Sequence, residues 1–382
     1  MSDLLQPVRP RYGEASLADI LPSALAVLGV PGSPDPLGLA AELDGVRRIA
    51  VLLVDGLGWH QIPTAAPYAP VLAGMAAAGG RPLTTGFPST TPTSLVSLGS
   101  GAAPGAHGVL GFRVRVPATE EILTHVFWTD EPDPHRWQPV PTQLERARAA
   151  GVAVTVVSRP EFEGSGLTVA ANRGGDFRGA AEPEELAREM LAALTAGPGP
   201  ALVSGYHRDL DLYGHLGGVD SQLWRVAAAE LDVLLERLRA GLPRDAALLV
   251  TADHGQLNVP VEHRFDLDAD PRLRAGVRLV AGEARVRYLH TEPGATADVV
   301  AAWSELLGEA AWVATRAEAV AAGWFGPVPP EHLGRIGDVV VACHGTYAVV
   351  ASVVDPGEAR LVGFHGSYTA AEMTIPLLVV RG

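Results

Sequence analysis

The sequence predicts an α/β fold with a doubly wound, mostly parallel sheet, helices on both faces and a smaller inserted subdomain. Short runs of consecutive apolar residues alternate with amphipathic helical patterns, which is typical of parallel strands covered on both faces. Between about residues 260 and 341 this pattern gives way to short strands and helices before the last apolar run. With 382 residues and 47% hydrophobic residues, the chain can bury a core of that size.

The predicted elements define three regions. Apolar strands are expected at residues 48–54, 152–157, 201–204, 247–251 and 375–380, and helices at residues 182–196 and 221–240. The inserted region has strand patterns at 277–280 and 284–289 and helical patterns at 295–307 and 316–322. We therefore expect an N-terminal strap (1–45), a catalytic α/β core (46–259 and 342–382) and an inserted cap subdomain (260–341).

Charge and cysteine content exclude several classes of protein. The formal net charge is −14 and no basic run occurs, so a dedicated nucleic-acid binder is not expected. The single cysteine, Cys343, excludes an intrachain disulfide or a thiolate metal cluster. Residues 1–13 lack a secretory signal pattern, and no apolar run approaches a membrane span. We expect a cytoplasmic protein without a membrane segment.

Potential metal ligands stand at or near the ends of these predicted strands. Ligands beyond the carboxyl ends of strands are typical of open α/β sheets. The chain places there three aspartates and three histidines, namely Asp55, Asp211, His215, Asp253, His254 and His365. Such oxygen and nitrogen donors suit two divalent ions, zinc or alternatively manganese. Two neighbouring ions favour phosphoryl-transfer chemistry.

A hydroxyl-rich segment provides a candidate nucleophile. Residues 86–94 carry several Ser and Thr hydroxyls directly before a predicted helix. A hydroxyl in that position is most often only a helix cap. However, the free N–H groups of a helix N-terminus also bind phosphate, so an activated hydroxyl there could attack it.

Five stretches together resemble one protein family. They are VLLVDGLG, FPSTTPTSLVSLGSGAAPGAHGVLGF, YHRDLDLYGHLGG, TADHG and the closing HGSYTAAEMTIPLLV. Their order and spacing are similar to the alkaline phosphatase superfamily, in its nucleotide pyrophosphatase/phosphodiesterase branch, over most of residues 46–382. The resemblance implies an alkaline-phosphatase-like fold and a metal-dependent hydrolase.

The resemblance also assigns roles to individual residues. It implies that one ion is held by Asp55, Asp253, His254 and the nucleophile, and the other by Asp211, His215 and His365. Ser100-Gly101 stands where the family has Thr-Gly, and counting back from it places the nucleophile at Thr91. Thr90 remains the alternative nucleophile, and Asp209 is the alternative ligand if the alignment is shifted.

Two departures from the family concern the substrate. Thr91 is followed by Pro92-Thr93-Ser94, whereas nucleotide-hydrolysing members have Phe-Pro-Asn, so no nucleobase preference follows. Ser94 is the candidate substrate-binding residue because it could donate one hydrogen bond. No Arg lies between Arg81 and Arg113, which argues against a dedicated monoesterase of the type that has an Arg soon after its nucleophile.

The sequence therefore predicts a two-metal hydrolase of small phosphodiesters or pyrophosphates that works through a covalent phosphothreonine. Two alternatives stay open. One is a phosphomonoesterase or phosphomutase of the same superfamily. The other is a non-catalytic binding protein on the same fold, against which the complete set of ligands counts.

Overall fold

The computed structural model describes residues 3–382, and its central feature is a seven-stranded sheet that confirms the predicted α/β class. The strand order is β2-β17-β8-β1-β7-β5-β6. β17 runs antiparallel to β8 and β2, whereas the other paired strands of this sheet are parallel. The bounds are β1 (Arg48–Val54), β2 (Arg81–Thr84), β5 (Ala153–Ser158), β6 (Asp176–Gly179), β7 (Ala201–His207), β8 (Ala246–Thr251) and β17 (Thr374–Arg381).

β1 lies at the centre of this sheet, and its apolar sequence fits a position that is covered on both faces. The residues of Ile49–Val54 are all buried, and β1 is hydrogen-bonded to β7 on one side and β8 on the other. β-branched and aliphatic side chains favour such a strand, which is covered on both faces. The carboxyl ends of β1, β7 and β8 consequently meet at one edge of the sheet.

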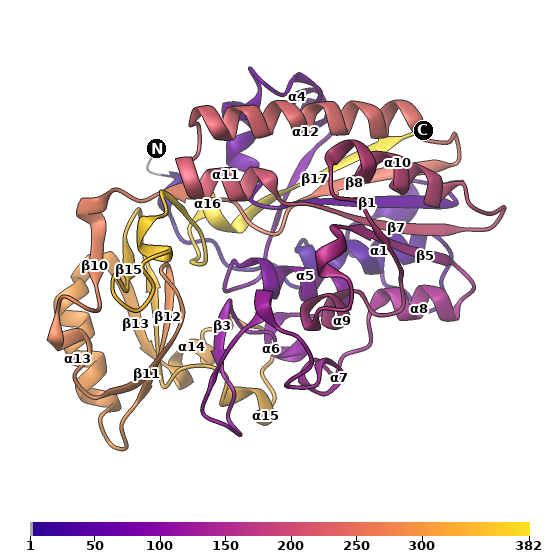
Figure 1. The fold of residues 1–382 in the computed structure, drawn as a ribbon. Helices are drawn as coiled ribbons and strands as arrows, with labels where there is room; N and C mark the ends of the chain where they lie inside the picture. The colour runs from indigo at the N-terminus through magenta and orange to yellow at the C-terminus, as the bar shows by residue number, and fades with distance from the viewer. Residues whose placement is uncertain (1–2) are drawn as a thin grey trace.

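Helices cover both faces of the seven-stranded sheet (Figure 1). One face carries α4 (Pro70–Ala77), α10 (Pro183–Leu194) and α12 (Gln222–Gly241), and the other carries α1 (Ile20–Val27), α5 (Thr91–Ser100), α8 (Gln143–Ala149) and α9 (Gly166–Asn172). α11 (Asp209–Gly217) follows β7 directly. α1 belongs to the same hydrophobic core as the sheet, through Leu21 and Leu25.

A separate antiparallel sheet, in the order β11-β12-β14-β13, is formed by the predicted insertion (260–341) and the two residues that follow it. Its strands are β11 (Val277–Glu283), β12 (Val286–Thr291), β13 (Ala311–Thr315) and β14 (Val339–Cys343), with α13 (Thr296–Leu307) and α14 (Arg316–Ala321) between them. Trp303 of α13 is fully buried in a second core with Leu289 and Val341. The exact division of the chain into three regions stays a prediction.

Further short strands and helices lie outside these two sheets. They are the strands β3 (Arg113–Arg115), β4 (Ile122–Thr124), β9 (Leu257–Asn258), β10 (Arg264–Asp266), β15 (Ala348–Val350) and β16 (Gly363–Phe364), and the helices α2 (Leu39–Glu42), α3 (Ile62–Ala65), α6 (Pro104–His107), α7 (Pro134–Trp137), α15 (Pro330–Leu333) and α16 (Ala370–Met373). Across residues 3–382, no helix is both long and apolar enough to cross a membrane.

A buried ion pair ties the antiparallel sheet to the core. Arg285, in the turn between β11 and β12, donates from Nε and Nη2 to the two carboxylate oxygens of Glu372 at 2.9 and 2.7 Å. Both side chains are fully buried. The Glu372 carboxylate also accepts the N–H of Ser367, and its backbone carbonyl accepts the N–H of Gly255. The pair therefore fixes the β11–β12 turn against two loops of the core.

Candidate active site

The six predicted ligands meet at the sheet edge where β1, β7 and β8 end. They form two groups, and within each group the ligand atoms lie within 4.8 Å of one another. We call Asp55, Asp253 and His254 the buried group, and Asp211, His215 and His365 the open group. Gly56 (φ 74°) makes the close approach possible, since a Cβ there would lie 2.9 Å from the Cα of Asp211.

The buried group surrounds one imidazole nitrogen with oxygen atoms. Asp55 follows β1, and Asp253 and His254 follow β8. His254 Nε2 lies 3.4 Å from Asp55 Oδ1 and 3.3 Å from Asp253 Oδ2, and 3.2 Å from Thr91 Oγ1. The other ring nitrogen, Nδ1, lies 3.2 Å from the carbonyl of Gly255. A neutral His254 that donates from Nδ1 therefore turns the lone pair of Nε2 toward these oxygens.

This arrangement of lone pairs fits a cation. Asp55 Oδ1 and Asp253 Oδ2 are buried without a hydrogen-bond partner, which is costly unless a cation neutralises them. Burial, and next the neighbouring Asp253 and Asp211, raise the pKa of Asp55 well above its usual value. Two carboxylates, an imidazole and a hydroxyl form a donor set suited to zinc or manganese.

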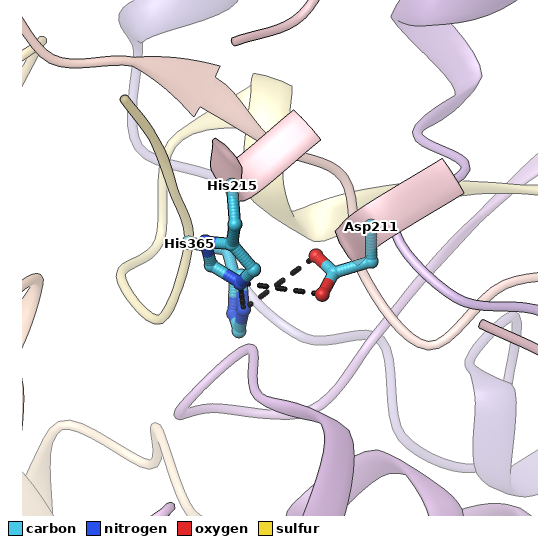
Figure 2. A group of neighbouring side chains, drawn as sticks. All are labelled: Asp211, His215 and His365. Atoms are coloured by element: carbon cyan, nitrogen blue, oxygen red, sulfur yellow. Dashed lines mark hydrogen bonds and ion pairs between the residues drawn. The ribbon is translucent and has the colours of Figure 1, made fainter. Parts of the chain in front are cut away.

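The open group comes from α11 and the loop after β16 (Figure 2). Asp211 and His215 are four residues apart on α11, so they share one helix face. His215 Nε2 lies 3.2 Å from Asp211 Oδ2 and 3.1 Å from His365 Nε2. The Nδ1 atoms of His215 and His365 lie 2.8 and 2.9 Å from the carbonyls of Gly363 and Ser89. Both Nε2 atoms therefore point inward and need a proton or a cation between them.

Charge is balanced differently in the open group. Burial disfavours the charged form of His215, but the adjacent Asp211 outweighs this and raises the pKa of His215 to about 9. Burial likewise disfavours ionised Asp211, yet His215 and His365 hold its pKa below the usual value. The rings of His365 and His254 stack at 3.6 Å, which places the two groups next to each other, as a two-metal site requires.

Thr91, the first residue of α5, lies next to the buried group. Its Oγ1 is 3.4 Å from Asp55 Oδ2 as well as 3.2 Å from His254 Nε2. Thr90, the alternative nucleophile, is the residue before the helix, and its fully buried hydroxyl interacts with the Glu283 side chain. Of the two hydroxyls, only that of Thr91 contacts the buried group within residues 3–382.

A cavity of about 560 Å³ opens over both groups, and we call it the open cavity. Thr91, Asp55, Asp211, His215 and His365 line it. Its outer wall carries Arg113, Arg208, Glu283, Asp355 and Glu358. Arg113 is paired with Asp355, and Arg287 is paired with Glu358. The antiparallel sheet contributes Glu283 and Ala284, so it forms part of the wall of the cavity.

Ser94, the predicted substrate-binding residue, lies in the core. Its side chain is fully buried, and its hydroxyl lies 2.9 Å from that of Thr85. It is not among the residues that line the open cavity. A role of Ser94 in substrate binding stays a prediction. The alternative ligand Asp209 is not part of either metal group and lies 3.7 Å from the guanidinium of Arg208.

Three further residues support the site, and the sequence assigned them no role. The Tyr206 hydroxyl donates to Asp55 Oδ2, and the Gln256 side-chain amide donates to Asp211 Oδ1 at 2.9 Å. Both stand within five residues of a ligand along the chain, a proximity that could have identified them. Glu283 lies far from any ligand in sequence. It reaches His365 through the space left by Gly366, where a Cβ would lie 2.9 Å from its carboxyl carbon.

Glu283 is a carboxyl group in the lining of the open cavity. Its Oε2 lies 4.0 Å from His365 Nδ1, and its side chain also interacts with the Thr90 hydroxyl. Burial, and next the charge of Glu358, raise the pKa of Glu283 to about 8. Near neutral pH Glu283 is therefore mostly protonated and adds little negative charge to the cavity.

Comparison with known protein families shows which family the chain belongs to. Residues 49–368 match the family described as type I phosphodiesterase / nucleotide pyrophosphatase. The chain belongs to this family. It is thus a hydrolase of the phosphodiesterase/nucleotide pyrophosphatase type, in the alkaline phosphatase superfamily, with two candidate metal sites. A comparison with curated protein sequences finds no match.

Solved structures share the fold at low identity. Murine ectonucleotide pyrophosphatase/phosphodiesterase 5 is 18% identical, with 87% of each chain covered and a TM-score of 0.69. An inactive threonine-to-alanine variant of the same murine protein in complex with AMP has a TM-score of 0.70, with 87% of this chain and 88% of that chain covered. Phosphonoacetate hydrolase from Sinorhizobium meliloti 1021, in complex with phosphonoformate, is 18% identical, with 88% of this chain and 90% of that chain covered and a TM-score of 0.67.

Proposed function

We propose that this family member hydrolyses small phosphodiesters, with Thr91 as the nucleophile and one divalent cation in each of the two groups. The observation that carries the proposal is the position of Thr91. Its Oγ1 faces His254 and Asp55 of the buried group and lines the open cavity together with the open group. Zinc is the first candidate ion and manganese the second, because both accept mixed carboxylate and imidazole donors.

In the proposed reaction, the ions and Thr91 would have separate roles. The bound ions would supply Lewis-acid activation of the hydroxyl and neutralise charge on the phosphoryl group. Thr91 Oγ1 forms a bond to phosphorus, while the bond from phosphorus to one ester oxygen breaks. That oxygen leaves with the electron pair and takes up a proton. Water then attacks phosphorus, so that Thr91 regains its hydroxyl and a phosphomonoester is released.

The start of α5 assists this step without any charged side chain. The first backbone N–H groups of a helix have no acceptor within the helix and carry partial positive charge. Thr91 is the first residue of α5, a helix of ten residues. Pro92 has no N–H, and the N–H of Ser94 is bonded to the Thr90 carbonyl. The phosphoryl oxygens next to Thr91 can therefore accept hydrogen bonds from the N–H groups of Thr91 and Thr93, and such donors stabilise charge that develops in the transition state.

The electrostatics of the open cavity favour diesters over monoesters. A monoester carries a second negative charge that needs an additional cationic partner. Arg113 is already paired with Asp355, and Arg208 lies 3.7 Å from Asp209, so neither of these guanidinium groups is free to be that partner. Diesters, with one negative charge, suit this wall better.

A nucleotide pyrophosphatase is the second candidate, and the AMP complex of the murine relative supports it. The nucleotides that such an enzyme cleaves carry several phosphates. Arg113 and Arg208 of the cavity lining are already paired with Asp355 and Asp209 and are not free to neutralise these additional charges, which is why we rank this activity second.

The proposal can be tested with two chromogenic substrates. With Zn²⁺ or Mn²⁺ added, we expect faster hydrolysis of bis-p-nitrophenyl phosphate than of p-nitrophenyl phosphate. Acid quenching during turnover, followed by peptide mass spectrometry, should find phosphate on Thr91. Thr91→Ala should reduce kcat for the diester by roughly 10³-fold or more, with both ions retained.

Thr90→Ala is the matched control and should reduce kcat far less. The opposite ranking of the two variants would move the nucleophile to Thr90. A strong preference for the monoester would contradict the charge argument and favour the phosphomonoesterase or phosphomutase alternative.

A further inference from the structure

Ser89, two residues before Thr91, joins the nucleophile segment to the loop that carries His365. Its side chain is fully buried, and Ser89 and Gly366 face each other as an isolated antiparallel bridge. The Ser89 N–H donates to the Gly366 carbonyl at 3.0 Å. The loop of residues 365–367 is therefore attached directly to the segment that leads into α5.

The second bond of this bridge goes to a side chain instead of the backbone. In a regular antiparallel pair, two facing residues can exchange two backbone N–H···O bonds. Here the Gly366 N–H donates to the Ser89 Oγ at 3.2 Å. The same hydroxyl donates to the Ser367 carbonyl at 2.6 Å. The Ser89 hydroxyl thus acts as acceptor and donor at once, in the place of a backbone partner.

The Ser89 carbonyl oxygen faces the imidazole of His365. It lies 2.9 Å from Nδ1, whereas the Glu283 carboxyl group lies 4.0 Å from Nδ1, beyond hydrogen-bond distance. When Nδ1–H donates to this carbonyl, the lone pair of Nε2 is free for a cation. Nε2 lies 3.1 Å from His215 Nε2 and 3.8 Å from Asp211 Oδ1, and Figure 2 shows these three side chains together.

Two buried backbone groups depend on the Ser89 hydroxyl. Gly366 and Ser367 are buried, and a buried polar group that loses its partner is destabilising. Without its hydroxyl, Ser89 would have only its carbonyl to offer the Gly366 N–H. A carbonyl that turns toward Gly366 moves away from His365 Nδ1, and the ring then loses the bond that fixes its tautomer.

The other hydrogen bonds of the loop hold Ser367 and not the imidazole. The Ser367 N–H donates to Glu372 Oε1 at 3.0 Å, and the Ser367 hydroxyl donates to the Cys343 carbonyl at 2.7 Å. Neither bond involves His365. Loss of the Ser89 hydroxyl should therefore leave the loop attached at Ser367 and release the ring of His365.

We propose that Ser89 is a positioning residue for the open group, because its hydroxyl keeps its own backbone carbonyl available to His365 Nδ1. This bond selects the tautomer in which Nε2 can bind the second cation. Partners of this kind typically change the affinity for a metal by about 10- to 100-fold. The inference rests on the two cation sites of the proposed function and is independent of the substrate.

Zinc titration of the metal-free protein tests the effect on affinity. Ser89→Ala should weaken one of the two ions by about 10- to 100-fold and leave the other unchanged, and Ser89→Thr, which keeps a hydroxyl, should restore most of the affinity. His215→Gln disables the open group, so adding Ser89→Ala to it should not weaken the remaining ion further. Unchanged affinities in Ser89→Ala, or weakening of the buried group, would overturn the inference.

Ser100→Ala is the matched control. Ser100 is 3% exposed, and its hydroxyl also joins two backbone groups: it donates to the Val96 carbonyl at 2.6 Å and accepts the Ala102 N–H at 3.3 Å. It stands at the opposite end of α5 from Thr91. Ser100→Ala should keep both ions at their original affinity. If it weakens zinc binding as much as Ser89→Ala does, the effect is general destabilisation and the inference is wrong.

Nuclear magnetic resonance tests the tautomer in the wild-type protein, without relying on any substitution of Ser89. In protein labelled with ¹⁵N-histidine, His365 should be protonated on Nδ1, with a proton signal that exchanges slowly with solvent and is identified by its loss in His365→Gln. Ser89→Ala should lose or shift this signal, and Ser100→Ala should retain it. Protonation of His365 on Nε2 in the wild-type protein would refute the inference.

Activity measurements separate this inference from the proposed function. With bis-p-nitrophenyl phosphate, the zinc concentration that gives half-maximal kcat should rise at least about tenfold in Ser89→Ala. Saturating zinc should restore most of kcat in Ser89→Ala and none in Thr91→Ala. An unchanged zinc dependence would overturn the inference and leave the proposed function standing. Selective weakening of one ion in a protein that hydrolyses no diester would support the inference and overturn the proposed function.

Discussion

The buried group and the open group hold similar side chains in different surroundings. The side chains of Asp253 and His254 are fully buried, and Asp55 is 4% exposed. In the open group, Asp211 and His215 are 14% and 21% exposed. The buried group has two carboxylates to one imidazole, whereas the open group has one carboxylate to two imidazoles.

Because of this difference, the two groups differ in how their side chains can find hydrogen-bond partners when no metal is bound. In the open group, a protonated His215 can donate to Asp211 or His365, so a proton can replace the cation. In the buried group, two carboxylates face a single imidazole, and two of their oxygens have no partner. The buried group therefore depends on a cation, and the open group depends on it less.

The largest expected effect is on catalysis. The buried group contacts the Thr91 hydroxyl, so Asp253→Asn should lower kcat/KM for a diester by on the order of 10³-fold. His215→Gln changes the open group and should lower kcat/KM less. Steady-state kinetics measures kcat/KM of both variants, and metal analysis determines how many ions each one binds. Equal losses of kcat/KM would show that the two groups do not differ in function.

The next effect is a pH dependence of the metal-free protein. The pKa of His215 is raised to about 9 in the folded protein, above its unfolded value, so the stabilisation is complete below pH about 6.5 and is lost as the pH rises through 9. The free energy of unfolding should fall by at most about 3 kcal/mol across this window. Urea denaturation with a chelator present measures it. His215→Gln should remove the dependence, and the same slope in that variant would contradict the assignment.

In the metal-free protein, replacing an aspartate by asparagine should change the free energy of unfolding in opposite directions in the two groups. Asp253→Asn removes a charge that repels Asp55, and an asparagine oxygen can still accept the N–H groups of Gly56 and His254. We expect stabilisation by about 1 kcal/mol. Asp211→Asn removes the partner of His215 and should destabilise by a similar amount. Thermal melts in chelator test the signs, and equal signs would refute the charge comparison.

The smallest expected effect is on cation binding, through the hydrogen bond from Gln256 to the ligand Asp211. Gln256 donates to Asp211 at 2.9 Å, so Gln256→Leu should weaken cation binding by roughly tenfold in the open group and leave the buried group unchanged. Competitive titration with a metal indicator resolves the two sites. Weakening at both sites would show that Gln256 acts on the whole sheet edge.

The central strands could be predicted because their patterns are local. Residues 48–54 form a continuous apolar run and become a strand buried on both faces, and the other four apolar runs also lie in the seven-stranded sheet. β2 and β6 had no such pattern. They are four-residue edge strands with exposed positions, so burial does not impose an apolar sequence on them.

The predicted ligands were also recoverable from local patterns, because four of them lie within three residues of the end of a strand and Asp211 and His215 share one helix face. Ser94 lies in the core, where its hydroxyl pairs with that of Thr85, and helical spacing does not reveal this. Glu283 reaches the cavity only through the docking of the antiparallel sheet. Nothing along the chain indicates which residue of that sheet will face the ions.

The Arg285–Glu372 pair has a consequence for how substrates enter. Swinging the β11–β12 turn outward would separate two fully buried, hydrogen-bonded charges, at a cost of several kcal/mol. The same movement would disturb the loops that follow His254 and His365. We therefore expect the antiparallel sheet to stay in place during substrate exchange and to act as a fixed wall of the open cavity, not as a lid. Selection among substrates would then depend on fit to a preformed surface.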